Sequence, residues 1–233
     1  MKNGKIILIL IMMLTLFGSV KAQRDYDDRM RLDIVPYVWA TTMNGNLTIN
    51  GEHRYINFTF SDFFKFSNLG LNGHIELRKS RWAFMFDYNY VDLIKDQTYT
   101  ELVLSELTLG YKIIGDLELL LGGRYFKSAV EYRDQEPIIK GKESWIDPII
   151  GGRLNVDLTR ALVFTARADI GGFGIGSDFA WNIMAGVGYR LSNITFLAAY
   201  RIWYAKYENG TGDSLFIYDL TTSGPGLAMV IHF

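Results

Sequence analysis

Histidine is the side chain best suited to acid–base chemistry at neutral pH, and His74 is the histidine with carboxylates in reach. The chain has three histidines. His74 stands two residues before Glu76, so a strand places both on one face, and Asp87 is expected on the neighbouring strand. Such a pair can serve acid–base catalysis, but a lone histidine facing inward is more often structural. We therefore predict no catalytic residues and no enzyme.

Metal-binding and cofactor motifs give no signal in this sequence. The chain has no cysteine, and it contains no HExxH, CxxC or EF-hand spacing. We predict no metal site and no cofactor.

A glycine-rich stretch, "ADIGGFGIGSDFAW" (residues 168–181), raises the question of a phosphate-binding loop. Such a loop follows a strand and opens a helix, whose N-terminus faces the anion. Here the segments on both sides alternate like strands, and Ser177 stands where the last glycine of GxGxxG belongs. We predict a return between two strands, and leave open whether Phe173 and Ile175 point into lipid or over a barrel mouth.

The charged residues elsewhere alternate with apolar ones at period two, which is typical of strands. In "WAFMFDYNYV" (residues 82–91), Trp82, Phe84 and Phe86 share one face with two tyrosines, and Asp87 lies on the other. Apolar faces rich in aromatics and charges in mid-strand favour lipid outside and a polar lumen inside. The sequence predicts an all-β fold, a transmembrane antiparallel up-and-down β-barrel.

Acids and arginines nearly balance on the faces predicted to line the lumen. One reading is a structural ladder of ion pairs, and the other is a narrow charged passage for small polar solutes. The predicted inward set is His74, Glu76, Arg78, Asp87, Glu106, Glu118, Arg124, Asp147, Arg153, Arg167, Asp169, Asp178, Arg190 and Arg201.

Connection lengths give the strand count. Very short links at residues 79–81, 114–116, 158–160 and 191–193 alternate with longer polar ones, as in outer-membrane barrels. Four short and five long links predict ten strands, with eight or twelve as alternatives, and place both termini on the periplasmic side. The predicted barrel covers residues 32–233, after a short periplasmic segment at residues 23–31.

The first 22 residues resemble a cleavable signal peptide, with Lys2 and Lys5 before an apolar run at residues 6–20. A membrane anchor is the alternative, but the run is shorter than the roughly 20 residues that span a bilayer. Without the three lysines of this leader, the chain has 21 of its 24 basic residues and all 25 acidic ones, which gives a net charge of −4. That balance argues against a nucleic-acid partner.

Three segments are less regular. "YTELVLSELTLGYKI" (residues 99–113) alternates poorly, and we place Glu106 inward and Leu107 outward. The last strand changes face between Phe216–Leu220 and Leu227–Phe233, which predicts a bulge near Gly224-Pro225-Gly226. The link at residues 41–68 has hairpin turn signals, including Asn50-Gly51; alternatively, "SDFFKF" forms a helix capped by Ser61 that plugs the lumen.

The motifs "PYVWATTMNG", "FSDFFKF", "WIDPIIGGR" and "ADIGGFGIGSDFAWN", with the terminal Phe233, resemble a largely uncharacterised family of Gram-negative outer-membrane β-barrels. The resemblance implies fold and outer-membrane location but no catalytic residues, and Phe233 resembles the signal read by the barrel-assembly machinery. Expected partners are outer-membrane lipid, that machinery and, for an open lumen, small polar solutes. We expect a porin-like or structural barrel; a rim enzyme acting on lipid or peptide and a surface-exposed binding protein are the alternatives.

Overall fold

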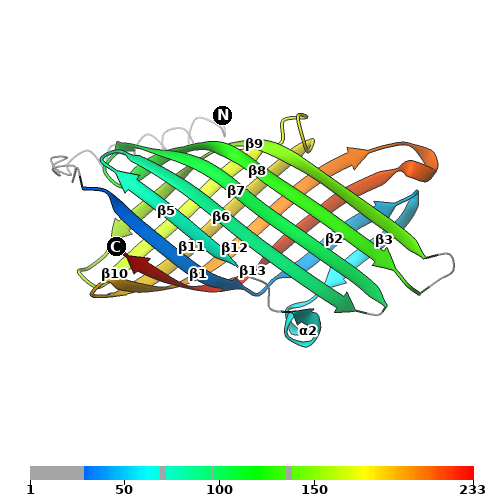
Figure 1. Cartoon of the computed structure of the whole chain (residues 1–233), viewed down its shortest axis with the longest axis horizontal. Helices are drawn as coiled ribbons and strands as arrows, with labels where there is room; N and C mark the ends of the chain where they lie inside the picture. The colour runs from blue at the N-terminus through cyan, green and yellow to red at the C-terminus, as the bar shows by residue number, and fades with distance from the viewer. Residues whose placement is uncertain (1–28, 69–71, 96, 135–137) are drawn as a thin grey trace, which may run out of the picture.

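The computed structural model describes residues 29–68, 72–95, 97–134 and 138–233, and it shows a closed antiparallel barrel (Figure 1). The predicted signal peptide lies outside the described residues. The elements are β1 (Arg31–Trp39), β2 (Thr42–Ile49), β3 (Glu52–Phe58), α2 (Phe60–Phe66), β4 (Ser67–Asn68), β5 (Gly73–Lys79), β6 (Trp82–Lys95), β7 (Thr98–Ile114), β8 (Leu117–Tyr132), β9 (Ile139–Asp157), β10 (Leu162–Gly171), β11 (Phe179–Leu191), β12 (Ile194–Asn209), η1 (Gly212–Ser214) and β13 (Phe216–His232). No helix within these ranges is long and apolar enough to cross a membrane.

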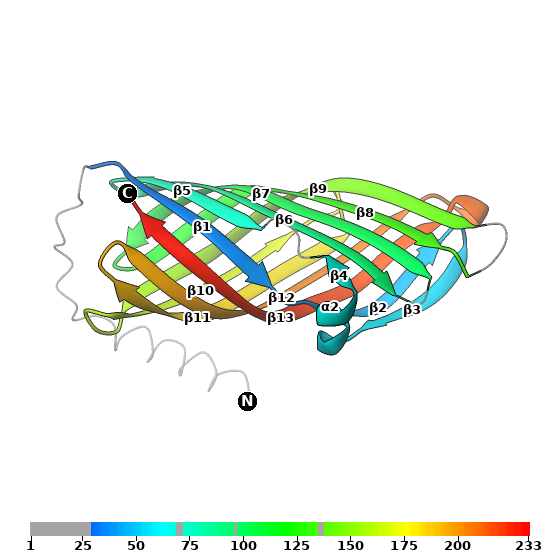
Figure 2. The ribbon, with the colours of Figure 1, turned by 60° about the horizontal axis from the view of Figure 1, so that its bottom comes forward.

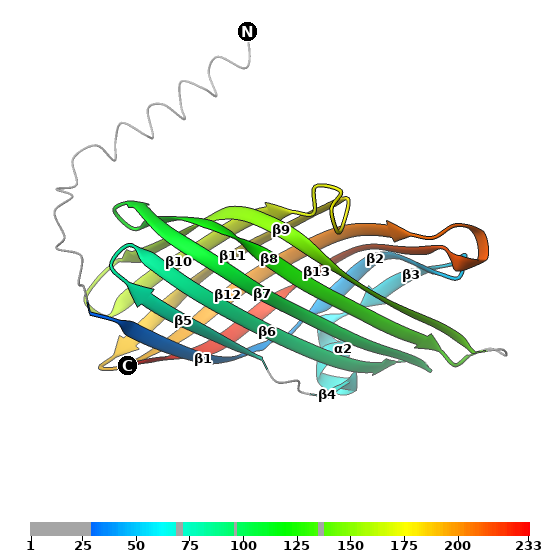
Figure 3. The ribbon, with the colours of Figure 1, turned by 45° about the horizontal axis from the view of Figure 1, so that its top comes forward.

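The barrel closes because β1 pairs with β5 on one side and with β13 on the other. In the ring that this pairing closes, ten strands surround the axis, β1 and β5 to β13, which confirms the predicted count. The start of β1 and the C-terminus meet at one end of the barrel, where Leu32 and Phe233 exchange backbone hydrogen bonds of 3.3 and 2.9 Å. The short turns lie at this same end (Figure 3).

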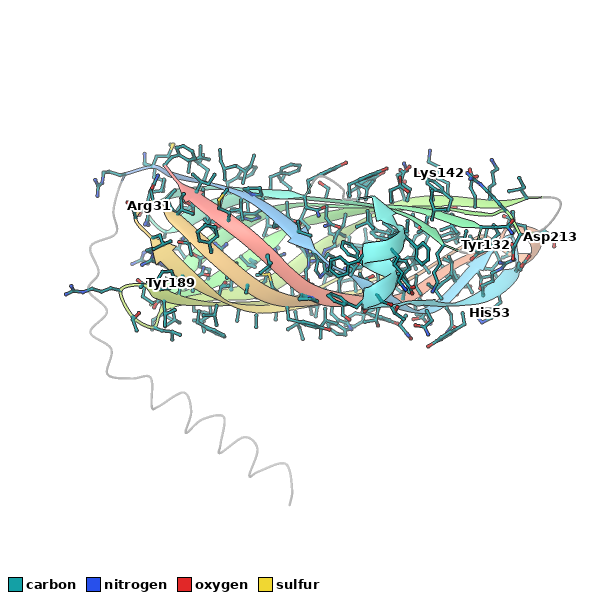
Figure 4. The ribbon with its side chains drawn as sticks, turned by 90° about the horizontal axis from the view of Figure 1, so that it is seen from below. Arg31, His53, Tyr132, Lys142, Tyr189 and Asp213 are labelled. Atoms are coloured by element: carbon teal, nitrogen blue, oxygen red, sulfur yellow. The ribbon has the colours of Figure 1, made fainter. Side chains whose placement is uncertain are left out.

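The barrel therefore has a terminal half, which carries the start of β1, the C-terminus and the short turns, and a distal half. Figure 4 shows Arg31 and Tyr189 at the terminal end, and His53 and Asp213 at the distal end. The predicted hairpin is confirmed in the distal half: β2 and β3 are joined by Asn50-Gly51, and both residues have positive φ (53° and 77°). Paired left-handed residues are the conformation that Asn-Gly supplies in two-residue hairpins.

The terminal half is apolar outside and charged inside. On β8, Leu117, Leu119 and Leu121 are exposed on the outer surface, while Glu118 and Arg124 are buried inside. The same outward pattern recurs around the wall at Phe84, Phe86, Leu107, Leu109, Ile183, Val187, Phe196 and Tyr200. An exposed apolar band of this kind is costly in water and suits the hydrocarbon core of a bilayer.

The distal half has the opposite polarity. Further along β8, Phe126, Val130 and Tyr132 are buried, and the alternate positions include Lys127 and Glu131. Leu102 and Leu104 on β7 are also buried inside, as are Trp203 on β12 and Tyr218 on β13. Here the barrel packs like a water-soluble one, with its apolar side chains in the interior. This inversion explains why residues 99–113 alternate poorly in the sequence.

The predicted bulge near Gly224–Gly226 is wrong. Pairing between β12 and β13 keeps one register from Ile194↔Ile231 to Asn209↔Phe216. Phe216, Tyr218 and Leu220 are buried inside the distal half, whereas Leu227 is exposed outside the terminal half. The apolar face changes side because the environment changes along the axis, and no extra residue is inserted.

Candidate functional site

Two linked clusters of charge fill the interior of the terminal half. In the first, Arg153 reaches Glu76 and Glu118, each at 2.6 Å, and Arg78 also pairs with both carboxylates. These side chains come from β5, β8 and β9, so the cluster ties together different parts of the wall. Buried charges are tolerated only when they are paired and hydrogen-bonded in this way.

The second cluster surrounds Glu106 of β7. Its carboxylate accepts hydrogen bonds from Arg124, Arg167 and Arg201 at 2.9, 2.6 and 2.9 Å. Arg124 and Arg167 also bind Asp169, at 2.6 and 2.9 Å. The side chains of Arg124 and Asp169 are completely enclosed, and the amide of Asn182 closes the cluster by donating to Asp169 and accepting from Arg201.

His74 and Asp87 connect the two clusters. The His74 ring lies 3.4 Å from Asp87 and 3.7 Å from Glu76, and Arg201 lies 3.8 Å from Asp87. Tyr37 donates a hydrogen bond of 2.9 Å to Asp87. The predicted contact of His74 with both carboxylates is therefore present. The two clusters and Asp87 together contain five carboxylates and five arginines. Their charges therefore cancel when His74 is left out of the count.

Three predicted inward residues lie elsewhere. Asp147 is buried but belongs to neither cluster: its carboxylate accepts from Trp145 Nε1 at 3.2 Å and from the backbone N–H of Ser177 at 2.7 Å. Arg190 pairs with Asp157 at 2.9 Å in an exposed position near the short turns. Asp178 is exposed, so its predicted place in the lumen is wrong; it precedes β11, in the return from β10, where alternation no longer fixes its direction.

An aromatic cluster fills the distal half directly beyond the charges. Phe126 lies 4.7 Å from both Trp145 and Trp203 between ring centroids, and 5.0 Å from Tyr218. Trp145 stacks on Tyr207 at 4.1 Å. These rings belong to one buried apolar cluster that includes Phe63 of α2. Sequence reasoning missed this cluster because it assigned the apolar face of each strand to lipid and expected a polar interior along the whole barrel.

The helix α2 lies against the side of the barrel and not in the lumen (Figure 2). Its N-terminus is capped by Asp62, which accepts from the backbone N–H and the hydroxyl of Thr59 at 2.9 and 2.8 Å. The prediction of a lumen plug capped by Ser61 is therefore wrong, although the helix itself exists. Phe63 is 4% exposed and points inward, whereas Phe64 is 67% exposed.

Lys95 at the end of β6 holds α2 in place. Its ammonium donates to Asp62 at 2.8 Å and to the backbone carbonyl of Asn57 at 3.3 Å. The hydrogen bonds from Lys95 and Thr59 lower the pKa of Asp62 to about 2, from its usual 3.8. Asp62 is therefore ionised at neutral pH and pairs with the lysine.

The glycine-rich loop after β10 projects outward from the wall. Gly172 donates to the carbonyl of Pro148 at 3.2 Å, which fastens the loop to β9. Phe173 is exposed and Ile175 is 76% exposed. The open question from the sequence is answered: both side chains lie on the outside and do not cover the mouth. Within the described parts of the chain, no group of three His, Asp or Glu side chains could hold a metal.

No protein-family model matches this sequence, and no curated protein matches it. Among solved structures, the outer membrane protease OmpT from Escherichia coli aligns with a TM-score of 0.53 at 8% identity, covering 91% of this chain and 99% of that one. The chain has the fold of an outer-membrane β-barrel. The translocator domain of the autotransporter NalP from Neisseria meningitidis (TM-score 0.40, 11% identity, 99% and 98% covered) and Ail, the attachment invasion locus protein of Yersinia pestis (0.38, 12%, 89% and 100%), are also similar.

Proposed function

We propose that this protein is an outer-membrane barrel with a sealed lumen, which acts in the membrane without conducting polar solutes. The observation that carries the proposal is the balanced, buried ion-pair network directly beneath a packed aromatic cluster. A passage for polar solutes needs water-filled space. Here the buried carboxylates and guanidinium groups form salt bridges with one another instead of with water. This supports the structural reading of the inward charges over the narrow charged passage.

The proposed setting is the outer membrane, reached by means of the signal peptide at residues 1–22. The terminal half spans the bilayer with the chain ends and short turns on the periplasmic side, and the distal half stands on the outer side. Phe233 at the periplasmic edge is proposed as the contact for the barrel-assembly machinery. The apolar outer band of the terminal half and its short turns support this orientation.

Planar-bilayer recording tests the sealed lumen. Purified protein, with insertion checked by heat-modifiable gel mobility, is expected to give no stepwise current at either polarity. A general-diffusion porin in the same bilayers shows that the assay detects pores. Reproducible current steps from the barrel would contradict the proposal.

We also infer that the barrel is not an enzyme. His74 lies among salt-bridged charges beneath the aromatic cluster, away from the distal rim where a lipid or peptide substrate would arrive. His74→Ala and, as a rim control, His53→Ala are expected to leave membrane lipid composition and peptide cleavage by intact cells unchanged. Loss of a lipid modification or a cleavage product in His74→Ala alone would support the rim-enzyme alternative instead.

A further inference from the structure

We propose that the groove on the outer wall between β9, the end of β12 and the return from β10 to β11 (residues 172–178) binds one lipid molecule of the outer leaflet. The acyl chain lies at the apolar end of the groove, and a headgroup with hydrogen-bond donors lies at its polar end. The inference rests on the proposed immersion of the terminal half, and it concerns the outer wall instead of the lumen.

The groove lies where no strand fills the space between β9 and β12. β9 pairs with β10 only from Asp157 to Ile149, and β12 pairs with β11 only as far as Lys206. The structure describes all of residues 139–148 and 207–209 beyond these pairs, and no backbone pairing joins the two segments. Side chains join them instead: Tyr207 Oη donates to Glu143 at 3.3 Å. The outer wall is therefore hollowed at this place.

The end of the groove toward the terminal half is apolar. Tyr125 and Ile146 line it as direct partners on β8 and β9, and Ile175 lines it from the return; all three are exposed. The exposed pair of Leu121 and Ile150 continues the apolar band below them. An acyl chain can therefore pass from the bilayer into the groove without leaving apolar surface.

The opposite end of the groove is polar. Ser144 lies two residues from Ile146 on the outer face of β9, and Glu208 and Asn209 line the groove from the end of β12. Ser144 and Glu208 are exposed, so a hydroxyl and a carboxylate face a headgroup that carries donors. The groove thus changes from apolar to polar in the same direction as a lipid of the outer leaflet. Its volume of about 620 Å³ lies within the roughly 300–1,000 Å³ of small-molecule sites.

The return is held rigidly on β9, where the sequence motifs "WIDPIIGGR" and "ADIGGFGIGSDFAWN" meet. Asp147 accepts from the backbone N–H of Ser177 at 2.7 Å, and a Cβ on Gly176 would clash with the carbonyl oxygen of Ile146. Phe173 has a φ of 55°, a conformation that persists in a non-glycine residue only where its surroundings fix it. This side of the groove is therefore formed before a lipid binds, which favours affinity.

The position of the return agrees with the proposed height of the bilayer. It projects from the outer wall near the middle of the barrel's length, where the terminal and distal halves meet (Figures 1 and 3). Phe173 and Ile175 are both exposed on it, and exposed apolar side chains that adjoin an apolar band suit contact with lipid. Only Ile175 lines the groove, so the two residues form a matched pair for a test.

Native mass spectrometry tests the site, because it counts the lipids that stay bound to the barrel. Protein in detergent micelles, titrated with dimyristoyl phosphatidylethanolamine, is expected to retain one lipid at concentrations where a second is rare. Ile175→Ser should weaken this binding about fivefold, because it removes apolar contact area, and Phe173→Ser should match the unchanged protein. A graded series of adducts without a preferred first lipid, or equal binding by Ile175→Ser, would overturn the site.

The headgroup and the position of the lipid are tested in the same micelles. Dimyristoyl phosphatidylcholine, in which methyl groups replace the N–H donors, should bind several-fold more weakly; equal retention would overturn the polar end of the site. A phosphatidylethanolamine with a diazirine in its acyl chain should cross-link to Tyr125, Ile146 or Ile175 in excess over Leu119. Equal labelling along the band would also contradict the proposal. These readouts depend neither on conductance nor on the depth of the barrel in a bilayer, so failure of the proposed function is detected separately.

Discussion

At the scale of single residues, the interior charges show how this barrel tolerates ions away from water. Arg124 is fully enclosed, yet its guanidinium meets both Glu106 and Asp169. The residue types and their inward direction were predictable, because alternation fixes the face of each side chain. The partners were not, since contacts such as that between Arg153 and Glu76 join strands far apart in the sequence and depend on barrel size and tilt.

Arg124→Leu is expected to destabilise the barrel by about 3–5 kcal/mol, because it leaves two buried carboxylates without their shared partner. The matched control is Arg190→Leu, which removes an exposed pair with Asp157 and should cost at most about 1 kcal/mol. Guanidinium-induced unfolding in lipid vesicles, followed by gel mobility, measures both. Similar midpoints for the two variants would contradict the structural role of the network.

Acid should loosen α2 through Asp62. Its pKa is lowered in the folded protein to about 2 from 3.8, so the contact with Lys95 stabilises α2 above pH 4 and is lost as the pH falls toward 2. A fluorophore attached at Lys65→Cys should keep its anisotropy from pH 7 to 4 and lose it between pH 4 and 2. With Asp62→Asn added, the anisotropy should be low at every pH. An anisotropy that does not change with pH in the labelled protein with Asp62 intact would contradict the contact with Lys95.

At the scale of elements, the last strand is the most instructive. β13 pairs with β1 from His232 to Gly226 and with β2 from Ser223 to Ile217, in one uninterrupted register. From the sequence its change of apolar face looked like a bulge, because periodicity shows that two faces differ without showing which one meets lipid. The polar residues between the buried ones, such as Asp219 between Tyr218 and Leu220, were the available signal.

Gly224 lies at the junction where β13 passes from β1 to β2, and a side chain does not fit there. A Cβ on Gly224 would lie 1.9 Å from the carbonyl oxygen of Ala40, whereas one on Gly226 would lie 3.2 Å from that of Val38. Gly224→Ala should therefore cost about 1–3 kcal/mol, and Gly226→Ala clearly less. Unfolding in vesicles compares the two variants; equal stability would show that the junction relaxes freely.

At the scale of the whole molecule, the inversion of polarity fixes the part of the barrel that contacts lipid. Strand number, closure and the positions of the ends followed from alternation and turn lengths. The division into two halves could not be predicted in this way, because it depends on the register of each strand against its neighbours. The family resemblance implied a fold, but it did not say which part of the barrel lies in the bilayer.

Site-directed labelling of the cysteine-free chain can locate the bilayer. A fluorophore at Leu119→Cys, on the outer face of the terminal half, should be quenched by doxyl-labelled acyl chains and protected from aqueous iodide. The same label at Lys127→Cys, eight residues further along β8, should show the reverse. Iodide quenching at both positions would contradict the proposed immersion of the terminal half.

The sharp change of polarity along each strand has a consequence for bilayer thickness. A barrel whose outer surface is apolar along its whole length can slide to match a thicker or thinner membrane. Here an upward or downward shift would bring Lys127 and Glu131 into hydrocarbon or expose Leu117 and Leu119 to water. The surrounding lipid must therefore adjust, at a cost of fractions of a kcal/mol for each ångström of mismatch. The barrel should accordingly partition into membrane regions of one preferred thickness.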